Sequence, residues 1–502
     1  MSEQIKLYSG GAGRSLILID LLVVLSLALL LSALADHVPL SGDYAAPWGK
    51  ISITSKPTVP ICLLCVFLLV RIALRNEGGK ITRLVSHPTA PRFFLIALLV
   101  YTANGSHSAS VDSNSTRLLP YSLIREGNFD LDEFRFLYAR QIPPFLVRTE
   151  RHMVSAYPTG AAILAVPFYL LPAWAGVSAE SKLLIQIEKF AASVFVALSV
   201  ALLYSAIKQF ESPNAAALLA WVYAFGTSSL SISSQGLWQH GPSQLLLAAS
   251  LYLLVAGISE KRWIALSGLT LGAAVLCRPT DIFIAIPLAA YVYRVHQNQF
   301  ARFAVCALPM ALFLGSYHFV YFGSPWRMGY DQGFFAGNGF ATPFLEGLPG
   351  ILWSPSRGLF VYSPVLLFSV LGGLLAWRRD GSLLLRYLGV SVLLVVALYS
   401  NWKIWWGGWA FGPRLLADLA PVLVFLIIPA FRLIERHVTL KRFFYFLAGI
   451  SIVIHTLGAY APVNWNPDLG GNEQRLWSWR DGELAATVYR LISKLTEYCI
   501  IR

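Results

Sequence analysis

Apolar stretches approaching 20 residues recur from one end of the chain to the other, and they limit the fold more than any other feature. A helix of that length crosses the hydrocarbon core of a bilayer, where each backbone polar group must find its partner inside the helix. Charged residues make up 13% of the 502 residues, against roughly 25% in soluble domains. The sequence therefore predicts an integral membrane protein built from helices.

Clusters of Lys and Arg separate the apolar stretches, and such clusters mark cytoplasmic loops. Expected spans near 16–36, 58–75 and 92–110 leave the following segment on the outer side. The later clusters agree with this orientation only if 160–177, which contains Pro167 and Pro172, is a re-entrant or partial helix. We expect an all-α polytopic protein with about 13 transmembrane helices, a cytoplasmic N-terminus and an external C-terminus.

Hydropathy divides the chain into four parts. They are N-terminal transmembrane helices (1–105), a large first external loop with interfacial helices (106–157), a transmembrane bundle (158–459) with an external loop at 320–360, and a short external cap (460–502). The long polar segments all fall on the outer side, so we expect the chemistry there.

Two other readings of the composition are excluded. The net charge of +13 does not indicate nucleic-acid binding, because the basic residues are dispersed among short loops between apolar stretches. Five scattered cysteines do not form a disulfide framework. Cys62 and Cys65 lie in an apolar stretch, where buried, unreactive side chains are expected rather than a metal or redox site.

Asp112 follows the third expected span and precedes a segment with helical apolar spacing, residues 115–127. Gly127 is a natural stop for this helix. We expect the helix to lie flat on the bilayer surface, with Arg117 and Arg125 toward lipid phosphates. Its apolar face is formed by Leu118, Leu119, Leu123 and Ile124.

Five motifs occur in a fixed order over most of residues 109–425. They are VDSNSTRLLPYSLIREGNFDLDEF (111–134), SAYPTGAAILAVPFYLL (155–171), YAFGTSSLSISSQGLWQHGPS (223–243), SPSRGLFVYSPVLL (354–367) and WWGGWAFGPRLLADLAP (405–421). In this order they resemble the GT-C glycosyltransferases, integral membrane enzymes that use lipid-phosphate-linked sugars, and within them the branch similar to bacterial protein mannosyltransferases.

The resemblance implies an inverting glycosyltransferase that moves a sugar from a polyprenyl-phosphate donor to a glycolipid, an envelope glycan or a protein. The expected location is a bacterial inner membrane, with the active site facing the periplasm or exterior. Asp112 stands where such enzymes carry the acidic residue that opens the first external loop. Relatives often have a second acid directly after it, whereas Ser113 follows here, so no obligatory metal is expected.

General chemistry supports the same role for Asp112. An acceptor hydroxyl that attacks the anomeric carbon needs a carboxylate within reach as general base. We expect burial to raise the pKa of this carboxyl and so to strengthen it as a base. Oxygen ligands from Asp112 together with Asp130, Asp132 or Glu133 would also suit an optional divalent cation, or these acids pair with neighbouring arginines.

The leaving group is a phosphate, so cations must lie where its negative charge develops. Each candidate sits near an expected outer boundary, and its alternative role is to reach lipid headgroups or to neutralise a nearby acid. Asp281 is the expected ion-pair partner of Arg278, and a cap of an interfacial turn is the alternative for His240. The candidates for donor-phosphate binding are Arg357, Arg414, Arg278, Lys403 and His240.

A further set of residues is expected to contact the sugar or the acceptor. Aromatic rings stack on sugar faces, although Trp and Tyr also gather at membrane interfaces regardless of function. The glycine spacing of GYDQGFFAGNGF (329–340) predicts a loop that closes over the substrates. The candidates are Asp130, Asp132, Tyr157, Trp238 and Asp331.

Two rival functions stay open. A flippase or transporter for a lipid-linked precursor predicts polar groups deep inside several spans, whereas the apolar stretches here are largely free of them. A polymerase or ligase for surface polysaccharide also works at the outer face, and only the order of the motifs argues against it.

Overall fold

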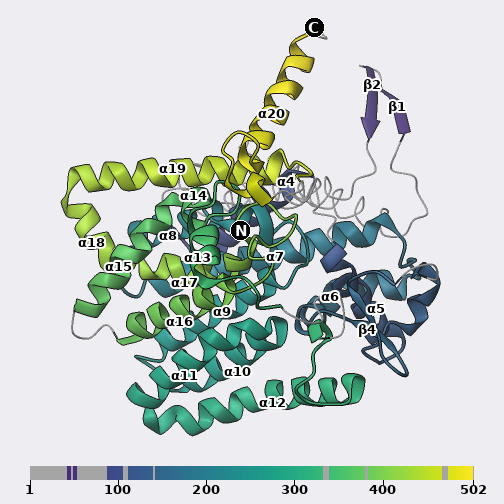
Figure 1. The fold of residues 1–502 in the computed structure, drawn as a ribbon, viewed down its shortest axis with the longest axis horizontal. Coiled ribbons are helices and arrows are strands. Elements are labelled where there is room, and N and C mark those ends of the chain that lie inside the picture. Colours follow the sequence, from purple (N-terminus) through teal and green to yellow (C-terminus); the bar gives the residue numbers. More distant parts are fainter. Residues whose placement is uncertain are drawn as a thin grey trace, which may run out of the picture.

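The computed structural model describes residues 42–46, 49–53, 88–105, 111–138, 142–331, 339–378, 383–465 and 473–500. This part of the chain is all-α apart from two small antiparallel sheets (Figure 1). Strand β1 (Gly42–Ala46) pairs with β2 (Gly49–Ile53), and β3 (Leu146–Arg148) pairs with β4 (Met153–Ser155). The spans expected near 16–36 and 58–75, with Cys62 and Cys65, lie outside the described residues.

Four helices are long and apolar enough to cross a membrane, judged by length and composition. They are α7 (Lys182–Ile207), α12 (Gln297–Phe322), α16 (Leu383–Ser400) and α19 (Val438–Tyr460). Arg414–Leu426 and Ile428–Arg436 make a fifth if this pair, bent by 51°, is one broken span. The expectation of about 13 spans is therefore wrong for the residues that the structure describes, which contain four or five.

The difference arises because most apolar stretches form helices that are too short. A helix of 15 residues is about 22 Å long, whereas the hydrocarbon core is about 30 Å thick. Segment 160–177, expected to be a partial crossing, forms one of these short helices. The short apolar helices are α4 (Ala90–Ala103), α6 (Gly160–Trp174), α8 (Pro213–Phe225), α9 (His240–Ala256), α10 (Arg262–Cys277) and Pro364–Arg378, which joins the turn η7 (Pro364–Leu366) to α15 (Leu367–Arg378).

Local sequence explains where several helices begin and end. Helix α8 starts at Pro213, where the missing N–H has no partner to lose, and the Ser212 side chain caps it by accepting from the Ala215 N–H at 3.2 Å. After α8 the chain passes through the π-helix η4 (Ser229–Ser233) before α9 begins. This irregular segment separates α8 and α9 into two short helices. The remaining helices are α5 (Asn114–Arg125), α11 (Ile282–Val295), α13 (Phe344–Trp353), α14 (Leu359–Tyr362), α17 (Ala420–Leu426), α18 (Ile428–Arg436) and α20 (Glu483–Ile500).

The described helices pack around two large buried apolar clusters, and a third, small cluster joins the β3–β4 sheet to the end of α12. The larger one lies inside the main bundle, where α7 packs against α4 and α9, α10 against α9 and α12, and α11 against α16. The other large cluster joins α5, α6 and the start of α7, and in Figure 1 these elements and β4 stand at one side of the bundle. The first external loop is thus a packed body beside the bundle.

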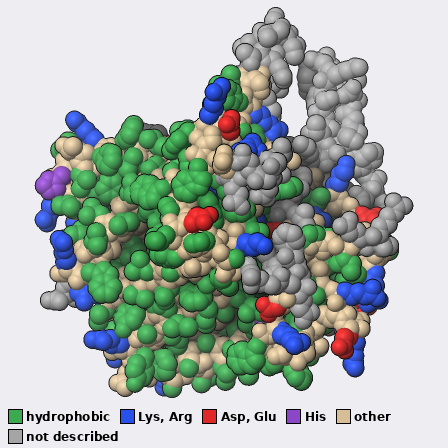
Figure 2. All heavy atoms as spheres, viewed as in Figure 1, with side chains coloured by type: hydrophobic (Ala, Val, Ile, Leu, Met, Phe, Trp, Pro, Cys, Tyr) green, Lys and Arg blue, Asp and Glu red, His purple; other side chains and the backbone are tan. Residues whose placement is uncertain are grey.

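The outer surface of the bundle is strongly apolar. On α12, Val305, Leu312 and Val320 are 60–67% exposed. Figure 2 shows hydrophobic side chains covering most of one face of the bundle, with Lys and Arg mainly near its edges. A patch of this extent is unfavourable in water and suits contact with lipid tails. Together with the long apolar helices, it indicates an integral membrane protein.

Helix α5 confirms the helix expected at 115–127, but its apolar face packs against protein and not against lipid. Leu118 and Leu119 are 1% exposed and pack in the cluster with α6, so the helix is enclosed by protein. Arg117 turns inward and lies 3.4 Å from Glu188 of α7, and Arg125 donates to backbone carbonyls of the α6 end. Both arginines thus have protein partners in place of the expected lipid phosphates.

Candidate active site

Two side chains hold the carboxylate of Asp112, which lies in the one-turn helix η2 (Val111–Ser113) before α5. Its Oδ1 accepts a hydrogen bond from the Tyr157 hydroxyl at 2.7 Å, and its Oδ2 pairs with the Arg414 guanidinium. The Arg414 Cζ lies 4.7 Å from the centre of the Trp238 ring, as in a cation–π contact. The fold thus joins four of the predicted site residues, although 302 positions separate Asp112 from Arg414.

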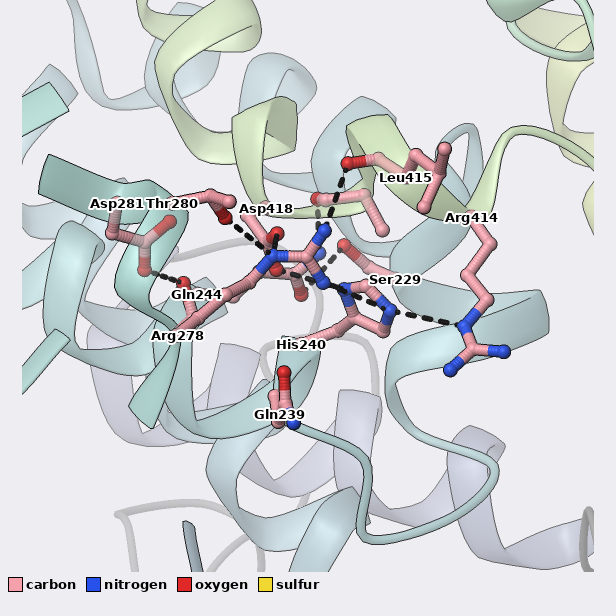
Figure 3. Close-up of polar contacts among 12 residues, drawn as sticks. Ser229, Gln239, His240, Gln244, Arg278, Thr280, Asp281, Arg414, Leu415 and Asp418 are labelled. Atoms are coloured by element: carbon pink, nitrogen blue, oxygen red, sulfur yellow. Dashed lines mark hydrogen bonds and ion pairs between the residues drawn. The ribbon is translucent and has the colours of Figure 1, made fainter. Parts of the chain in front are cut away.

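His240 continues this cluster from Arg414 into the protein interior (Figure 3). Its Nε2 lies 3.4 Å from the Arg414 Nε, and its Nδ1 lies 2.9 Å from a carboxylate oxygen of Asp418. The second Asp418 oxygen lies 2.6 Å from the Nε of Arg278. His240 begins α9, Arg278 follows α10, and Asp418 belongs to the short helix η8 (Arg414–Leu419), so the cluster fastens three elements together.

Arg278 is almost completely buried and all its nitrogens have partners. Its NH1 lies 2.7 Å from the His240 Nδ1, and its NH2 donates to the Tyr399 hydroxyl at 2.5 Å. The expected ion pair with Asp281 is wrong, because Asp418 takes that place and Asp281 accepts from the Ser243 hydroxyl at 2.6 Å. Arg278 is therefore placed to position other side chains, whereas Arg414 is the arginine next to Asp112.

The loop at Gly329 packs closely against the backbone at Ala156, next to Tyr157. A Cβ on Gly329 would lie 2.5 Å from the backbone oxygen of Ala156, so only glycine fits there without movement. This contact sets the Tyr330 ring 5.6 Å from the Tyr157 ring, edge to face, and the Tyr330 hydroxyl accepts from the Gln239 amide at 3.2 Å. The sequence named Asp331 as a sugar contact, but its neighbour Tyr330 is the residue that reaches the cluster.

The charge state of Asp112 differs from the expectation. Burial raises the pKa of this carboxyl, but the Arg414 guanidinium and the hydrogen bonds from Tyr157 and Arg414 lower it further, so the net pKa lies below the ordinary value. Burial and the neighbouring Asp112 charge raise the pKa of Tyr157, which keeps its hydroxyl protonated as a donor. In this state Asp112 is an ionised but weak base.

The described residues also contain a supporting pair that the sequence reasoning missed. Glu188 of α7 accepts from the Leu237 N–H at 3.2 Å, next to Trp238, and lies 3.4 Å from Arg117 of α5. The adjacent Lys189 donates to Gln235 at 2.5 Å. The available signal was a Glu-Lys pair inside an apolar stretch, since ionisable residues in such a position are functional candidates.

Two predicted phosphate ligands are not joined to the Asp112 carboxylate. Arg357 is 1% exposed and forms a buried ion pair with Glu483, at the start of α20. Its NH2 also donates to the Gly408 carbonyl at 3.1 Å. Lys403 is exposed, and its side chain has no hydrogen bond or ion pair within the described residues.

A narrow recess lies between Arg414 and Arg357, and as the side chains stand it has no room for a water molecule. Its lining residues are Arg357, Arg414, Trp405, Trp406, Ile351 and 413–416.

The acids that follow α5 form a separate group. Ligand atoms of Asp130, Asp132 and His152 lie within 4.8 Å of one another, which would suit a cation. These atoms already have protein partners: Asp132 lies 2.9 Å from His152, accepts from the Met153 N–H at 2.7 Å and pairs with Arg135 at 2.8 Å. Asp112 is not part of this group, so the described residues do not bring it together with Asp130 and Asp132 around one cation.

Two further acids named from the sequence have hydrogen-bond partners other than the groups around Asp112. Asp331 closes its own turn by accepting from the Met328 N–H at 2.9 Å. Glu133 accepts from the Ser122 hydroxyl on α5. The loop expected to close over the substrates lies mostly at 332–338, outside the described residues.

The site was also compared with known proteins. No protein-family model matches this sequence, and no curated protein matches it.

Proposed function

We propose that this chain is an inverting membrane glycosyltransferase similar to the GT-C enzymes, with Asp112 as its general base. The donor is a sugar linked to polyprenyl phosphate, and the acceptor is a hydroxyl group of a glycolipid, an envelope glycan or a protein. The observation that carries the proposal is the contact between Asp112 and Arg414 beside the Trp238 ring. On the proposal, these three residues would serve as proton acceptor, phosphate-binding cation and sugar-stacking surface.

The chemistry assigns one task to each group. The acceptor oxygen attacks the anomeric carbon as its proton passes to a carboxylate oxygen of Asp112. The bond from that carbon to the phosphate oxygen breaks, and its electron pair stays on the phosphate. Arg414 stabilises the charge that develops there, as a bidentate donor suited to phosphate. The Trp238 ring, which the Arg414 guanidinium covers in the structure, would stack on the transferred sugar once that guanidinium moves.

The proposed location is the outer face of a bacterial inner membrane. The positions of the basic clusters along the sequence support this side for the segment that carries Asp112, because such clusters are typical of cytoplasmic loops. A polyprenyl donor has its tail in the bilayer, so its phosphate must react close to the membrane boundary. Asp112 lies shortly after the apolar helix α4, which agrees with that depth.

Replacement of Asp112 by Asn tests the role of the base. The amide would keep the shape of the side chain but could not accept the proton, so sugar transfer should fall by roughly 10²–10⁴-fold. The measurement is single-turnover transfer from a synthetic polyprenyl-phosphate sugar by the purified protein. Asp481→Asn, at an exposed acid of the C-terminal tail, is the matched control and should keep full transfer. Full turnover by D112N would exclude Asp112 as the base.

One observation favours a second candidate, a flippase for a lipid-linked precursor. Glu188 and Lys189 are buried charged residues within the candidate span α7, as a translocation path would require. Their partners are Arg117 of α5 and residues of the loop before α9, next to the site, which favours a supporting role. Movement of a labelled donor across liposomes by the purified protein, without sugar transfer, would support the flippase instead.

The polysaccharide polymerase or ligase is distinguished by its product. A polyprenyl monophosphate that carries one sugar should yield an acceptor with one added residue if the proposed transferase is correct. Transfer of preassembled chains from a diphosphate carrier, with none from the monophosphate, would favour the ligase.

A further inference from the structure

The recess beside Arg414 is lined by hydrogen-bond donors that lack acceptors. Within the described part of the chain, the Nε of Arg357 and the indole Nε1 atoms of Trp405 and Trp406 are buried without a hydrogen-bond partner. These three residues are 1%, 3% and 8% exposed, and all of them line the recess with Arg414. Buried polar groups are rarely left unpaired, and three residues with such donors around one recess would suit a ligand there.

The chemistry of the lining limits the class of ligand. Indole and guanidinium N–H groups can donate hydrogen bonds but cannot accept them. A ligand that satisfies all of them must therefore offer several acceptor oxygens, and the two arginines favour a negative charge. A phosphate group meets both conditions, whereas a sugar hydroxyl or a lipid tail does not.

Arg414 belongs to this recess and to the Asp112 pair at the same time. In the structure its guanidinium is bound to Asp112 and its Nε lies 3.4 Å from His240. The recess is too narrow for a phosphate as the side chains stand, so at least one lining side chain must move. Arg414 is 19% exposed at its side chain, whereas Arg357 is fixed by the buried Glu483 pair.

We infer that the donor's phosphate binds in this recess and draws the Arg414 guanidinium away from Asp112, which frees the carboxylate only when the donor is present. The inference rests on the proposed function and names the place of the phosphate and the order of events. The donor phosphodiester carries one negative charge, and transfer leaves a phosphate monoester with two. Two arginines and two indole donors thus match the product side better than the substrate side, as catalysis requires.

Competition for one guanidinium has a measurable consequence. A carboxylate that holds Arg414 opposes phosphate binding, and the opposition is reciprocal. D112N removes the competing charge, so the protein should bind polyprenyl monophosphate roughly fivefold more tightly or better. The measurement is the Kd for polyprenyl monophosphate in detergent, with Asp481→Asn as the control that leaves it unchanged. Unchanged or weaker binding by D112N would overturn the inference.

The recess itself is tested with the two indoles. Trp405→Phe and Trp406→Phe, separately and together, keep an aromatic ring but remove the N–H donors. Each should weaken binding of polyprenyl monophosphate several-fold, because each removes one hydrogen bond to a charged group, whereas uncharged polyprenol should bind equally to all variants. Trp263→Phe, at the first turn of α10, is the matched control. Wild-type affinity for the phosphate in both single variants would reject the recess as its site.

Competition by inorganic phosphate and sugar transfer by D112N distinguish failure of the inference from failure of the proposed function. Inorganic phosphate at increasing concentration should compete with the lipid if the phosphate group alone is recognised, and the Trp variants should weaken that competition too. If D112N loses sugar transfer but does not bind phosphate more tightly, Asp112 remains the base and only the inference about the recess is rejected. If D112N keeps full sugar transfer, the proposed function is rejected, whatever its affinity for polyprenyl monophosphate.

Discussion

One ion pair sets the charge state of the candidate site. Burial alone raises the pKa of Asp112, but Arg414 and the hydrogen bonds lower it below the ordinary value. The pair therefore stabilises the fold above the carboxyl's unfolded pKa, and this contribution is lost as the pH falls through the lower folded pKa. At neutral pH the free enzyme holds Asp112 ionised.

The Tyr157 hydroxyl offers a direct test of this account. It donates to Asp112 and lowers the pKa of that carboxyl, so Tyr157→Phe should raise the pKa. The acid limb of the pH profile of kcat/KM, which reports the free enzyme, should move to higher pH. Tyr321→Phe, whose hydroxyl accepts from the Phe129 N–H instead, should leave the limb in place. A limb that stays fixed or moves to lower pH in Y157F would contradict the assignment.

Single residues were predictable where a motif surrounded them. Asp112, Tyr157, Trp238, His240 and Arg414 were all named from the sequence, and the fold brings them together. Asp418, which binds both His240 and Arg278, was not predicted. In the sequence it is an ordinary acid after RLLA, and only its contacts with the start of α9 and the end of α10 give it a role in the site. Tyr399 had no signal at all, since a tyrosine near the end of an apolar helix suits any membrane interface.

At the scale of elements, helix α7 is the support for the site. Its Glu188 binds the backbone next to Trp238 and the arginine of α5, and Lys189 binds Gln235. Sequence periodicity predicted α5 and its apolar face, but periodicity does not show whether lipid or protein covers that face. The inward turn of Arg117 depends on Glu188, which lies 71 positions away and is beyond any local pattern.

Removal of the Glu188 carboxylate should loosen this support. Glu188→Ala leaves Arg117 without its buried partner and the Leu237 N–H without an acceptor, and the free energy of unfolding should fall by roughly 3 kcal/mol. Thermal unfolding in detergent measures the loss, and Glu180→Ala, at an exposed acid before α7, is the control. A wild-type melting temperature for E188A would show that α7 does not hold these loops.

At the scale of the whole molecule, the sequence predicted the class but not the number of spans. Hydropathy does not show where an apolar stretch leaves the helical path, and the π-helix and loop between α8 and α9 are one example. Ser and Gln side chains there are buried by neighbouring helices, which only the assembled bundle reveals. The described residues therefore hold fewer crossings than the stretches suggest.

The exposed apolar side of α12 should face lipid. A spin label attached to Cys in place of Leu312, which is 60% exposed, should be accessible to oxygen and protected from a water-soluble nickel reagent in liposomes. A label at the exposed Arg480 of the C-terminal segment should show the opposite preference. Strong nickel accessibility at position 312 would place α12 in water and remove the membrane assignment for that face.

The Arg357–Glu483 pair ties the C-terminal segment to the candidate site. Glu483 also accepts from the Tyr362 hydroxyl and the Gly412 N–H, so it fixes the loop that leads into Arg414. During synthesis this contact cannot form before residue 483 has left the ribosome. On the proposed function, a nascent chain that stops before residue 483 would lack the support of this loop and would be unable to consume the sugar carrier.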